Sequence, residues 1–477
     1  MHRHHIEMKT RNTLTALLLA FSLSVPAQDY DTVTGTIDQI IYDQLPDGSD
    51  IALMVYDLTA DTTIYAYRER VMCRPASVQK VVTSITALSS LGTDYTFDTR
   101  LCSLGSISQD SVLNGDLYLI GGLDPSLMEQ DLKNMVAGLK KAGISRIRGK
   151  VYADVSAMDS IFWGSGWCWD DAPSSFQPYI SPLMVHEGYV GVQVKPTAKG
   201  QAPEVVLFPS NSYVTVENTA LTGVSSKGPL KITRDWTNNS NNIRISGNCT
   251  RRQATDLSVV GTDKFAFALF REYMQQAGIR CDGYGWAECP AMANTLVTVS
   301  HGIQGIMKEA LKESNNLYAE CMFLQTGRIN CPKGVSFSES ARFTENFVAR
   351  KFGFRTSQFN VVDGCGLSMY DMFSPSFMVD MLSMIYKDRK LYDILYRSLP
   401  VSGVDGTLKT RMNSKNSITK VHAKTGSVTG ACTLAGYLKT ANGHDVAFCI
   451  MNEGVLKMAA SRNVQDAICN ALCEFGM

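Results

Sequence analysis

A run of short strand-like segments fills the middle of the chain, from about residue 94 to residue 299. These segments are rich in β-branched and aromatic residues and are separated by Gly, Asn and Ser, which predicts a mostly β region. The stretches on both sides have a different pattern, in which amphipathic helices alternate with strands. We therefore predict that residues 94–299 form one or two inserted domains. The domain that they interrupt would consist of residues 28–93 and 300–477.

The strands predicted for the interrupted domain lie near both ends of the chain. Two of them come early and three come late, and Asn442-Gly443 between the last two is a strong hairpin signal. We expect all five to pair in one antiparallel sheet flanked by helices, an α/β (α+β) fold. The five predicted strands are 51–56, 62–67, 418–424, 433–438 and 446–451.

The N-terminus has the pattern of a secretory signal peptide. Lys9 and Arg11 precede an apolar run at 14–23, which is too short to span a bilayer. Small residues then allow cleavage after Ala27, so residues 1–27 would be removed from an exported, periplasmic protein. An uncleaved N-terminal anchor is the alternative.

Charge and cysteine content narrow the choice of partners and cofactors. The chain has 45 basic and 45 acidic residues, and loss of the signal peptide removes three basic and one acidic residue, for a net charge of about −2. This balance argues against a nucleic-acid partner. The thirteen cysteines are an odd number, so at least one lies outside any intramolecular disulfide. No Cys-x-x-Cys pair is present, which argues against a zinc site, and we expect no cofactor. Cys281 with Cys289 and Cys321 with Cys331 are candidate disulfides, which the sequence leaves open.

Ser77 and Lys80 form the first candidate for chemistry. They are three residues apart at the start of a predicted helix that begins near Pro75, so their side chains share a face. A serine hydroxyl is a poor nucleophile, but a neighbouring amine can accept its proton if burial lowers the pKa of that amine. The pair is a candidate acyl-transfer centre, although this spacing is also common on solvated helix faces.

Two later motifs make the chemical interpretation the stronger one. Ser314 and Asn316 form a Ser-x-Asn between two predicted helices, and residues 424–426 form a Lys-Thr-Gly in a predicted strand. Alone, the first would suit a helix cap and the second a solvated strand end. In this order, however, Ser-x-x-Lys, Ser-x-Asn and Lys-Thr-Gly are the signature of penicillin-binding proteins and serine β-lactamases.

On these motifs the chain resembles the class C low-molecular-mass penicillin-binding proteins, the D-alanyl-D-alanine carboxypeptidase/endopeptidase group. Residues 115–127 are similar to that group's Gly-Asp-Leu … Asp-Pro-x-Leu stretch. Residues 363–368 are similar to its Asp-Gly-Ser-Gly-Leu-Ser loop, with Cys365 in place of the usual serine. The resemblance implies a transpeptidase-like catalytic domain with a large insertion.

The resemblance also implies roles for the reacting groups. Ser77 would attack the carbonyl of the penultimate D-alanine, and Lys80 would accept the proton of its hydroxyl. Ser314 would relay a proton to the leaving amine, and Asn316 would orient Lys80 and the substrate amide. The backbone N–H groups of Ser77 and Ser427 would form the oxyanion hole.

A second set of residues would bind the substrate. Lys424 would attract the terminal carboxylate and Thr425 would hydrogen-bond it, with Gly426 and Ser427 continuing the same strand. Asp154 resembles an aspartate of the inserted domains that contacts the amino end of the stem-peptide diamino acid, and a turn or cap residue is the alternative.

The implied partners are peptidoglycan stem peptides as substrates and β-lactams as covalent inhibitors, with peripheral membrane or wall association left open. The alternatives are a β-lactamase-like hydrolase and a non-catalytic protein that binds penicillin or peptidoglycan. A Ser-His-Asp hydrolase is disfavoured because the chain has no Gly-x-Ser-x-Gly. The sequence does not choose between trimming terminal D-alanine and cutting cross-links.

Overall fold

The computed structural model describes residues 30–476. The predicted signal peptide at residues 1–27 lies outside the described residues. Among those that are described, no helix is both long and apolar enough to cross a membrane. All thirteen cysteines fall in the described part, and none of them is in a disulfide bond there.

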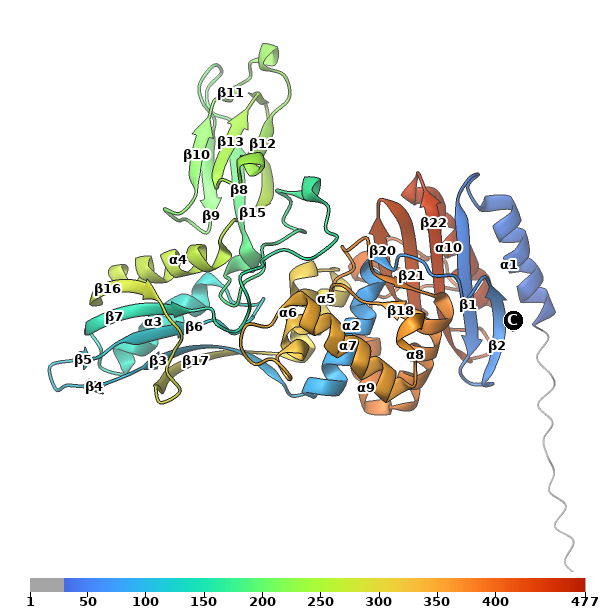
Figure 1. Cartoon of the computed structure of the whole chain (residues 1–477). Helices are drawn as coiled ribbons and strands as arrows, with labels where there is room; N and C mark the ends of the chain where they lie inside the picture. The colour runs from blue at the N-terminus through green and yellow to red at the C-terminus, as the bar shows by residue number, and fades with distance from the viewer. Residues whose placement is uncertain (1–29, 477) are drawn as a thin grey trace, which may run out of the picture.

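A five-stranded antiparallel sheet joins the two ends of the described chain, as predicted (Figure 1). Its strand order is β2-β1-β22-β21-β20, and the Asn442-Gly443 hairpin connects β21 to β22. The N-terminal strands thus pair directly with the C-terminal ones, for example Leu53 with Ile450. The strands are β1 (Asp50–Asp57), β2 (Thr62–Tyr67), β20 (Val421–Val428), β21 (Gly430–Lys439) and β22 (Asp445–Val455).

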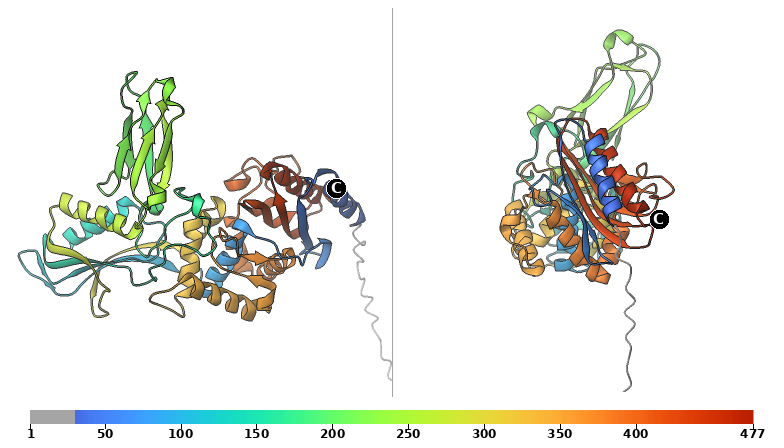
Figure 2. Two further views of the ribbon diagram at one scale, coloured as in Figure 1. Left: turned by 45° about the horizontal axis from the view of Figure 1, so that its top comes forward. Right: turned by 90° about the vertical axis from the view of Figure 1, so that its right-hand side faces the viewer.

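Helices cover both faces of this sheet (Figure 2). On one face α1 (Asp31–Gln44) and α10 (Met458–Glu474) bury a compact apolar layer that includes Ile37, Phe448 and Ile468. On the other face α2 (Gln79–Leu91) is buried along most of its length, because further helices surround it. These are α5 (Ile303–Lys312), α6 (Asn316–Gly327), α7 (Phe337–Phe352), α8 (Pro375–Lys387) and α9 (Arg389–Ser398).

The middle of the chain has its own sheets and its own apolar core. The largest sheet has the order β17-β3-β6-β7-β5-β4, with β16 pairing β7. It consists of β3 (Thr96–Ser103), β4 (Ser106–Ile107), β5 (Val112–Asn114), β6 (Leu117–Ile120), β7 (Arg146–Asp154), β16 (Arg280–Trp286) and β17 (Asn294–Gly302). Its first and last strands along the chain, β3 and β17, pair with each other, so the chain leaves and returns at neighbouring points.

Smaller sheets extend from this part of the molecule (Figure 1). Two three-stranded sheets have the orders β15-β8-β9 and β10-β13-β12. Helices α3 (Glu129–Lys141) and α4 (Thr262–Gln276) pack in the same region. The strands are β8 (Tyr189–Lys195), β9 (Glu204–Phe208), β10 (Thr215–Asn218), β12 (Lys231–Arg234), β13 (Asn242–Ser246) and β15 (Gln253–Ser258), with the short pair β11 (Leu221–Thr222) and β14 (Asn248–Cys249). One more short pair, β18 (Phe359–Asn360) and β19 (Met372–Phe373), lies outside the middle of the chain and packs in the apolar core around α2.

Candidate active site

Ser77 lies in a tight turn at the start of α2. The prediction that the α-helix begins near Pro75 is wrong in detail, since a 3-10 turn at Ala76–Val78 precedes α2, which begins at Gln79. Ala76 has a φ of 47°, in the left-handed region that is uncommon for a residue with a Cβ. The turn nevertheless keeps Ser77 one turn from Lys80, with 3.0 Å between the Ser77 Oγ and the Lys80 Nζ.

The Lys80 amine is completely enclosed. Its Nζ is within hydrogen-bond distance of the Ser77 hydroxyl, of Asn316 Oδ1 at 2.6 Å and of the Cys365 carbonyl at 2.8 Å. The side chain is 0% exposed, and burial lowers the pKa of Lys80 although the acidic groups nearby oppose this effect. A neutral amine in this position can accept the proton of the Ser77 hydroxyl.

The Ser-x-Asn segment lies between α5 and α6, and its residues have separate functions. Asn315 is the N-cap of α6, and its side chain accepts a hydrogen bond from the Tyr318 N–H. Ser314 has a φ of 60° and turns its hydroxyl to Lys424, while Asn316 turns its amide to Lys80 and donates from Nδ2 to the Phe176 carbonyl. The capping role that the sequence allowed for the motif therefore belongs to Asn315.

Lys424 forms the third corner of the site. Its Nζ donates to Ser314 Oγ at 2.8 Å and to the Thr425 carbonyl at 2.7 Å. The side chain is 0% exposed, and burial holds the pKa of Lys424 well below its usual range, with a further decrease from the charge of Lys80. The three motifs thus converge, and their two amines lie close enough to influence each other.

Gly426 brings strand β20 against the Ser77 turn. A Cβ on Gly426 would lie 2.1 Å from Thr433 Oγ1, 2.8 Å from the Pro75 carbonyl oxygen and 3.0 Å from the Ser77 backbone nitrogen. Contacts this short are not tolerated, so only glycine allows the strand to pass this close.

We expect Gly426→Ala to slow β-lactam acylation by about ten- to a hundredfold and to lower the free energy of unfolding by about 1–3 kcal/mol, because the turn must move. Stopped-flow acylation and urea unfolding measure the two effects. Gly305→Ala in α5 is the matched control, since its new Cβ would meet nothing within 4 Å. Unchanged acylation in Gly426→Ala would contradict this account.

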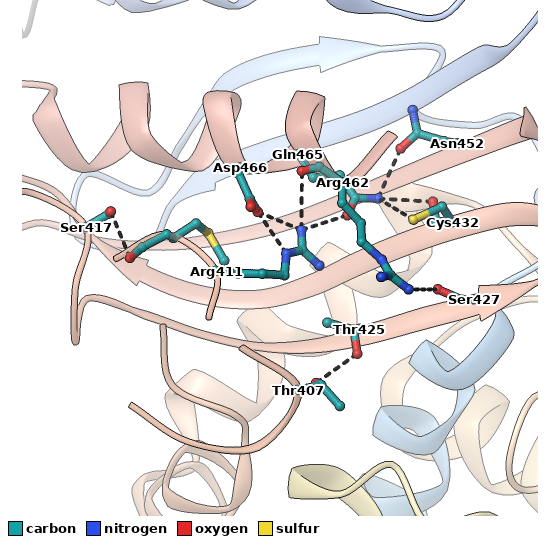
Figure 3. A network of polar contacts seen from close by, with 11 residues as sticks. Thr407, Arg411, Ser417, Thr425, Ser427, Cys432, Asn452, Arg462, Gln465 and Asp466 are labelled. Carbon is teal, nitrogen blue, oxygen red and sulfur yellow. Dashed lines mark hydrogen bonds and ion pairs between the residues drawn. The ribbon is translucent and has the colours of Figure 1, made fainter. Parts of the chain in front are cut away.

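Thr425 and Ser427 extend the site along β20 (Figure 3). The Thr425 hydroxyl donates to Thr407 Oγ1 at 2.8 Å. Ser427 Oγ accepts from Nη2 of Arg462, on helix α10, at 3.4 Å. Neither Thr407 nor Arg462 was identified from the sequence, because they come from segments without a motif.

A buried carboxyl group fixes the loop that contacts the Lys80 amine. Glu320 on α6 accepts hydrogen bonds from the Gly364 and Cys365 N–H groups at 3.0 and 2.8 Å, and so fixes the loop whose Cys365 carbonyl reaches Lys80. Burial, aided by the charge of Asp363, raises the pKa of Glu320 to about 8. The serine-to-cysteine change at residue 365 leaves this contact intact, since the backbone makes it.

Glu320→Leu should reduce acylation about tenfold or more and destabilise the fold by about 2–4 kcal/mol, because two buried N–H groups lose their acceptor. Glu320→Gln retains an acceptor and should be much milder. The raised pKa means that folded Glu320 holds its proton between pH about 4.5 and about 8. Its contribution to stability is therefore complete below that window and is lost as the pH rises through it.

Urea unfolding at several pH values tests the direction of this pH dependence. The free energy of unfolding of the wild type should fall relative to that of Glu320→Gln as the pH rises toward 8. A gain instead would contradict it.

A metal site finds little support in the described residues. Glu320, Asp363 and Cys365 are the group whose ligand atoms lie within 4.8 Å of one another. The Glu320 and Asp363 oxygens, however, accept backbone N–H groups of the 364–368 loop. We therefore assign this group to the support of the loop.

Asp154 lies apart from the other predicted residues. It is 5% exposed, and its oxygens accept hydrogen bonds from the Ser156 and Cys289 N–H groups. It lines a separate cavity of about 380 Å³, to which Arg100 and Arg328 also contribute. None of the other predicted site residues lines this cavity, so a substrate contact by Asp154 stays a prediction.

A family comparison decides how the chain is classified. The model of the D-Ala-D-Ala carboxypeptidase 3 (S13) family matches residues 33–474, which is almost the whole described chain. The chain belongs to the S13 family. This agrees with the resemblance inferred from the three motifs.

Known proteins match this chain along most of their length. The D-alanyl-D-alanine carboxypeptidase of Actinomadura sp. is 29% identical over 462 residues, 92% of this chain and 84% of the relative. The crystal structure of penicillin binding protein 4 from Haemophilus influenzae superposes with a TM-score of 0.82 and 25% identity, covering 92% of this chain and 99% of that one. The same protein complexed with a β-lactam gives a TM-score of 0.76 and 24% identity, covering 92% and 100%.

Proposed function

We propose that this S13 member is a serine D-alanyl-D-alanine carboxypeptidase and/or endopeptidase that acts on peptidoglycan stem peptides through an acyl-enzyme. The observation that carries the proposal is the 3.0 Å contact between the Ser77 hydroxyl and a fully buried Lys80 amine. A similar protein also supports the proposal: the matched Haemophilus influenzae protein is a penicillin binding protein, and one of its crystal structures contains a bound β-lactam.

In the acylation step the Ser77 Oγ forms a bond to the carbonyl carbon of the penultimate D-alanine, and Lys80 takes the hydroxyl proton. The N–H groups of Ser77 and Ser427 face the developing oxyanion, and each such donor contributes about 3–4 kcal/mol in comparable enzymes. The C–N bond then breaks. Ser314, whose hydroxyl can both accept and donate, relays the proton to the leaving amine.

Water completes the cycle by attacking the acyl carbon and giving a proton to Lys80. The bond between this carbon and the Ser77 Oγ then breaks, and Lys80 returns the proton to the Ser77 oxygen. When the leaving amine belongs to a terminal D-alanine the reaction is a carboxypeptidation, and when it belongs to another stem peptide a cross-link is cut. A β-lactam acylates Ser77 by the same attack, but its leaving amine stays attached.

The proposal also covers where the protein acts and what each part of the chain does. Residues 1–27 direct export, and the mature protein works in the periplasm, with peripheral association to membrane or wall. Residues 28–93 and 300–477 form the catalytic domain, residues 94–299 the inserted domains, and Asp154 contacts the stem peptide from the insertion.

Digestion of purified peptidoglycan tests the proposed reaction. The wild type should release free D-alanine, convert cross-linked dimers to monomers, or do both, as read by mass spectrometry, and Ser77→Ala should do neither. Products identical to those of the Ser77→Ala control would reject the proposal.

A further inference from the structure

The substrate of the proposed reaction ends in a carboxylate, but the lysine beside that end is poorly placed to supply positive charge. The Lys424 amine is fully buried and directs its hydrogen bonds to two neutral acceptors, Ser314 Oγ and the Thr425 carbonyl. Within the described residues, no carboxylate is within ion-pair distance of Lys424 to keep it charged. Another cation is needed if the carboxylate is to be recognised by charge.

Arg462 is a cation in the required place. It lies in the second turn of α10, is exposed, and reaches across to β20, where its Nη2 is 3.4 Å from Ser427 Oγ (Figure 3). No carboxylate of the described residues forms an ion pair with it. Asp466, one turn further along α10, is bound by Arg411 through Nη2 at 2.7 Å and Nε at 3.0 Å.

A cavity opens beside Arg462 and Thr425. It has a volume of about 490 Å³ and is lined by both threonines of the Thr425–Thr407 hydrogen bond and by Arg462. Arg411 and Asp466 also line it, and they form an ion pair with each other, so their charges are matched. Of the two guanidinium groups on this cavity, Arg462 is therefore the one left to bind an incoming anion.

The cavity also lies beside the segment of β20 that packs against the Ser77 turn. Thr425 and Ser427 flank Gly426, the residue of β20 whose added Cβ would lie 3.0 Å from the Ser77 backbone nitrogen. In a D-alanyl-D-alanine end, three bonds separate the scissile carbonyl carbon from the carboxylate carbon, a span of about 4 Å. A carboxylate held along this strand would leave its penultimate carbonyl within reach of Ser77.

We infer that Arg462, with the Thr425 and Ser427 hydroxyls, forms the recognition site for the free terminal carboxylate of the substrate. This inference rests on the proposed function and deepens it, because it assigns the choice of a carboxylate end to Arg462 rather than to Lys424. The guanidinium offers two parallel N–H donors that match a carboxylate.

The test compares two acylated peptides that end in D-Ala-D-Ala, one with a free carboxylate and one amidated. Arg462→Gln should lower kcat/KM for the free acid by about tenfold or more, mainly through KM, and should leave the amide within about twofold. Arg462→Lys should recover part of the loss, since lysine keeps the positive charge but lacks the two parallel N–H donors of the guanidinium group. Lys457→Gln, at the exposed start of the same helix, is the charge-matched control.

The rates of acylation by penicillin and by its methyl ester provide a second comparison of a free with a blocked carboxylate in the wild type and the variants. Thermal unfolding checks that the variants fold. Equal losses on the acid and the amide, or no loss on the acid, would overturn the inference while the wild-type activity upholds the proposed function. A wild type that cleaves neither peptide would overturn both.

Discussion

Replacing Ser77 by alanine is expected to lower kcat/KM for a D-Ala-D-Ala peptide by at least about a thousandfold, because no other group can form the acyl bond. The Lys80 amine would remain buried and hydrogen-bonded to Asn316 Oδ1 and the Cys365 carbonyl. Substrate should therefore still bind with little change in affinity. Release of D-alanine under single-turnover conditions and equilibrium binding of the same peptide measure the two quantities.

Ser84→Ala is the matched control for Ser77→Ala. Ser84 is on the same helix, is fully buried, and its hydroxyl has no hydrogen-bond partner among the described residues. Its removal should leave activity unchanged and stability within about 1 kcal/mol. An active Ser77→Ala enzyme would show that another residue is the nucleophile.

Replacing Lys80 by methionine should cost at least about a thousandfold in the acylation rate. Methionine has a similar length and suits a buried position, but it cannot take the proton from Ser77. Burial lowers the pKa of Lys80, so the neutral amine is present at a lower pH than for an ordinary lysine. The wild-type rate should rise with pH as this amine loses its proton, and the residual rate of Lys80→Met should lack that rise.

The same pKa predicts how stability depends on pH. Between the lowered pKa of folded Lys80 and the value of about 10.5 in the unfolded chain, the unfolded state binds more protons, so stability rises with pH over this window. Urea unfolding should show a shallower rise for Lys80→Met than for the wild type. An identical slope in both proteins would mean that Lys80 keeps its proton when folded.

Much of the fold could be predicted because its signals are local. The hairpin dipeptide and the strand-like runs near both chain ends predict the sheet that the structure shows. Helix α9 has no clear boundary signal in the sequence, because only Asp388 separates it from α8, and that residue serves as its N-cap. The 3-10 turn at Ser77 was missed for a related reason, since the apolar spacing that follows it fits a helix beginning earlier.

The site could be predicted only where residues belong to a motif. Glu320 resembles any polar residue of a helix, and its role depends on a contact with residues 364 and 365, more than forty positions away. The Phe176 carbonyl beside Asn316 carries no side-chain signature at all. Arg462 approaches Ser427 only because α10 packs across the sheet, a tertiary contact with no local trace in the sequence.

The convergence of the three motifs on Ser77 is the central claim, and labelling with a β-lactam tests it most directly. The intact protein should gain the mass of one penicillin, and proteolytic mapping should place that mass on the peptide that contains Ser77. Loss of the label in Ser77→Ala, with retention in Ser84→Ala, would complete the expected result. A label on a different peptide, or a wild type that stays unmodified at millimolar penicillin, would contradict the account.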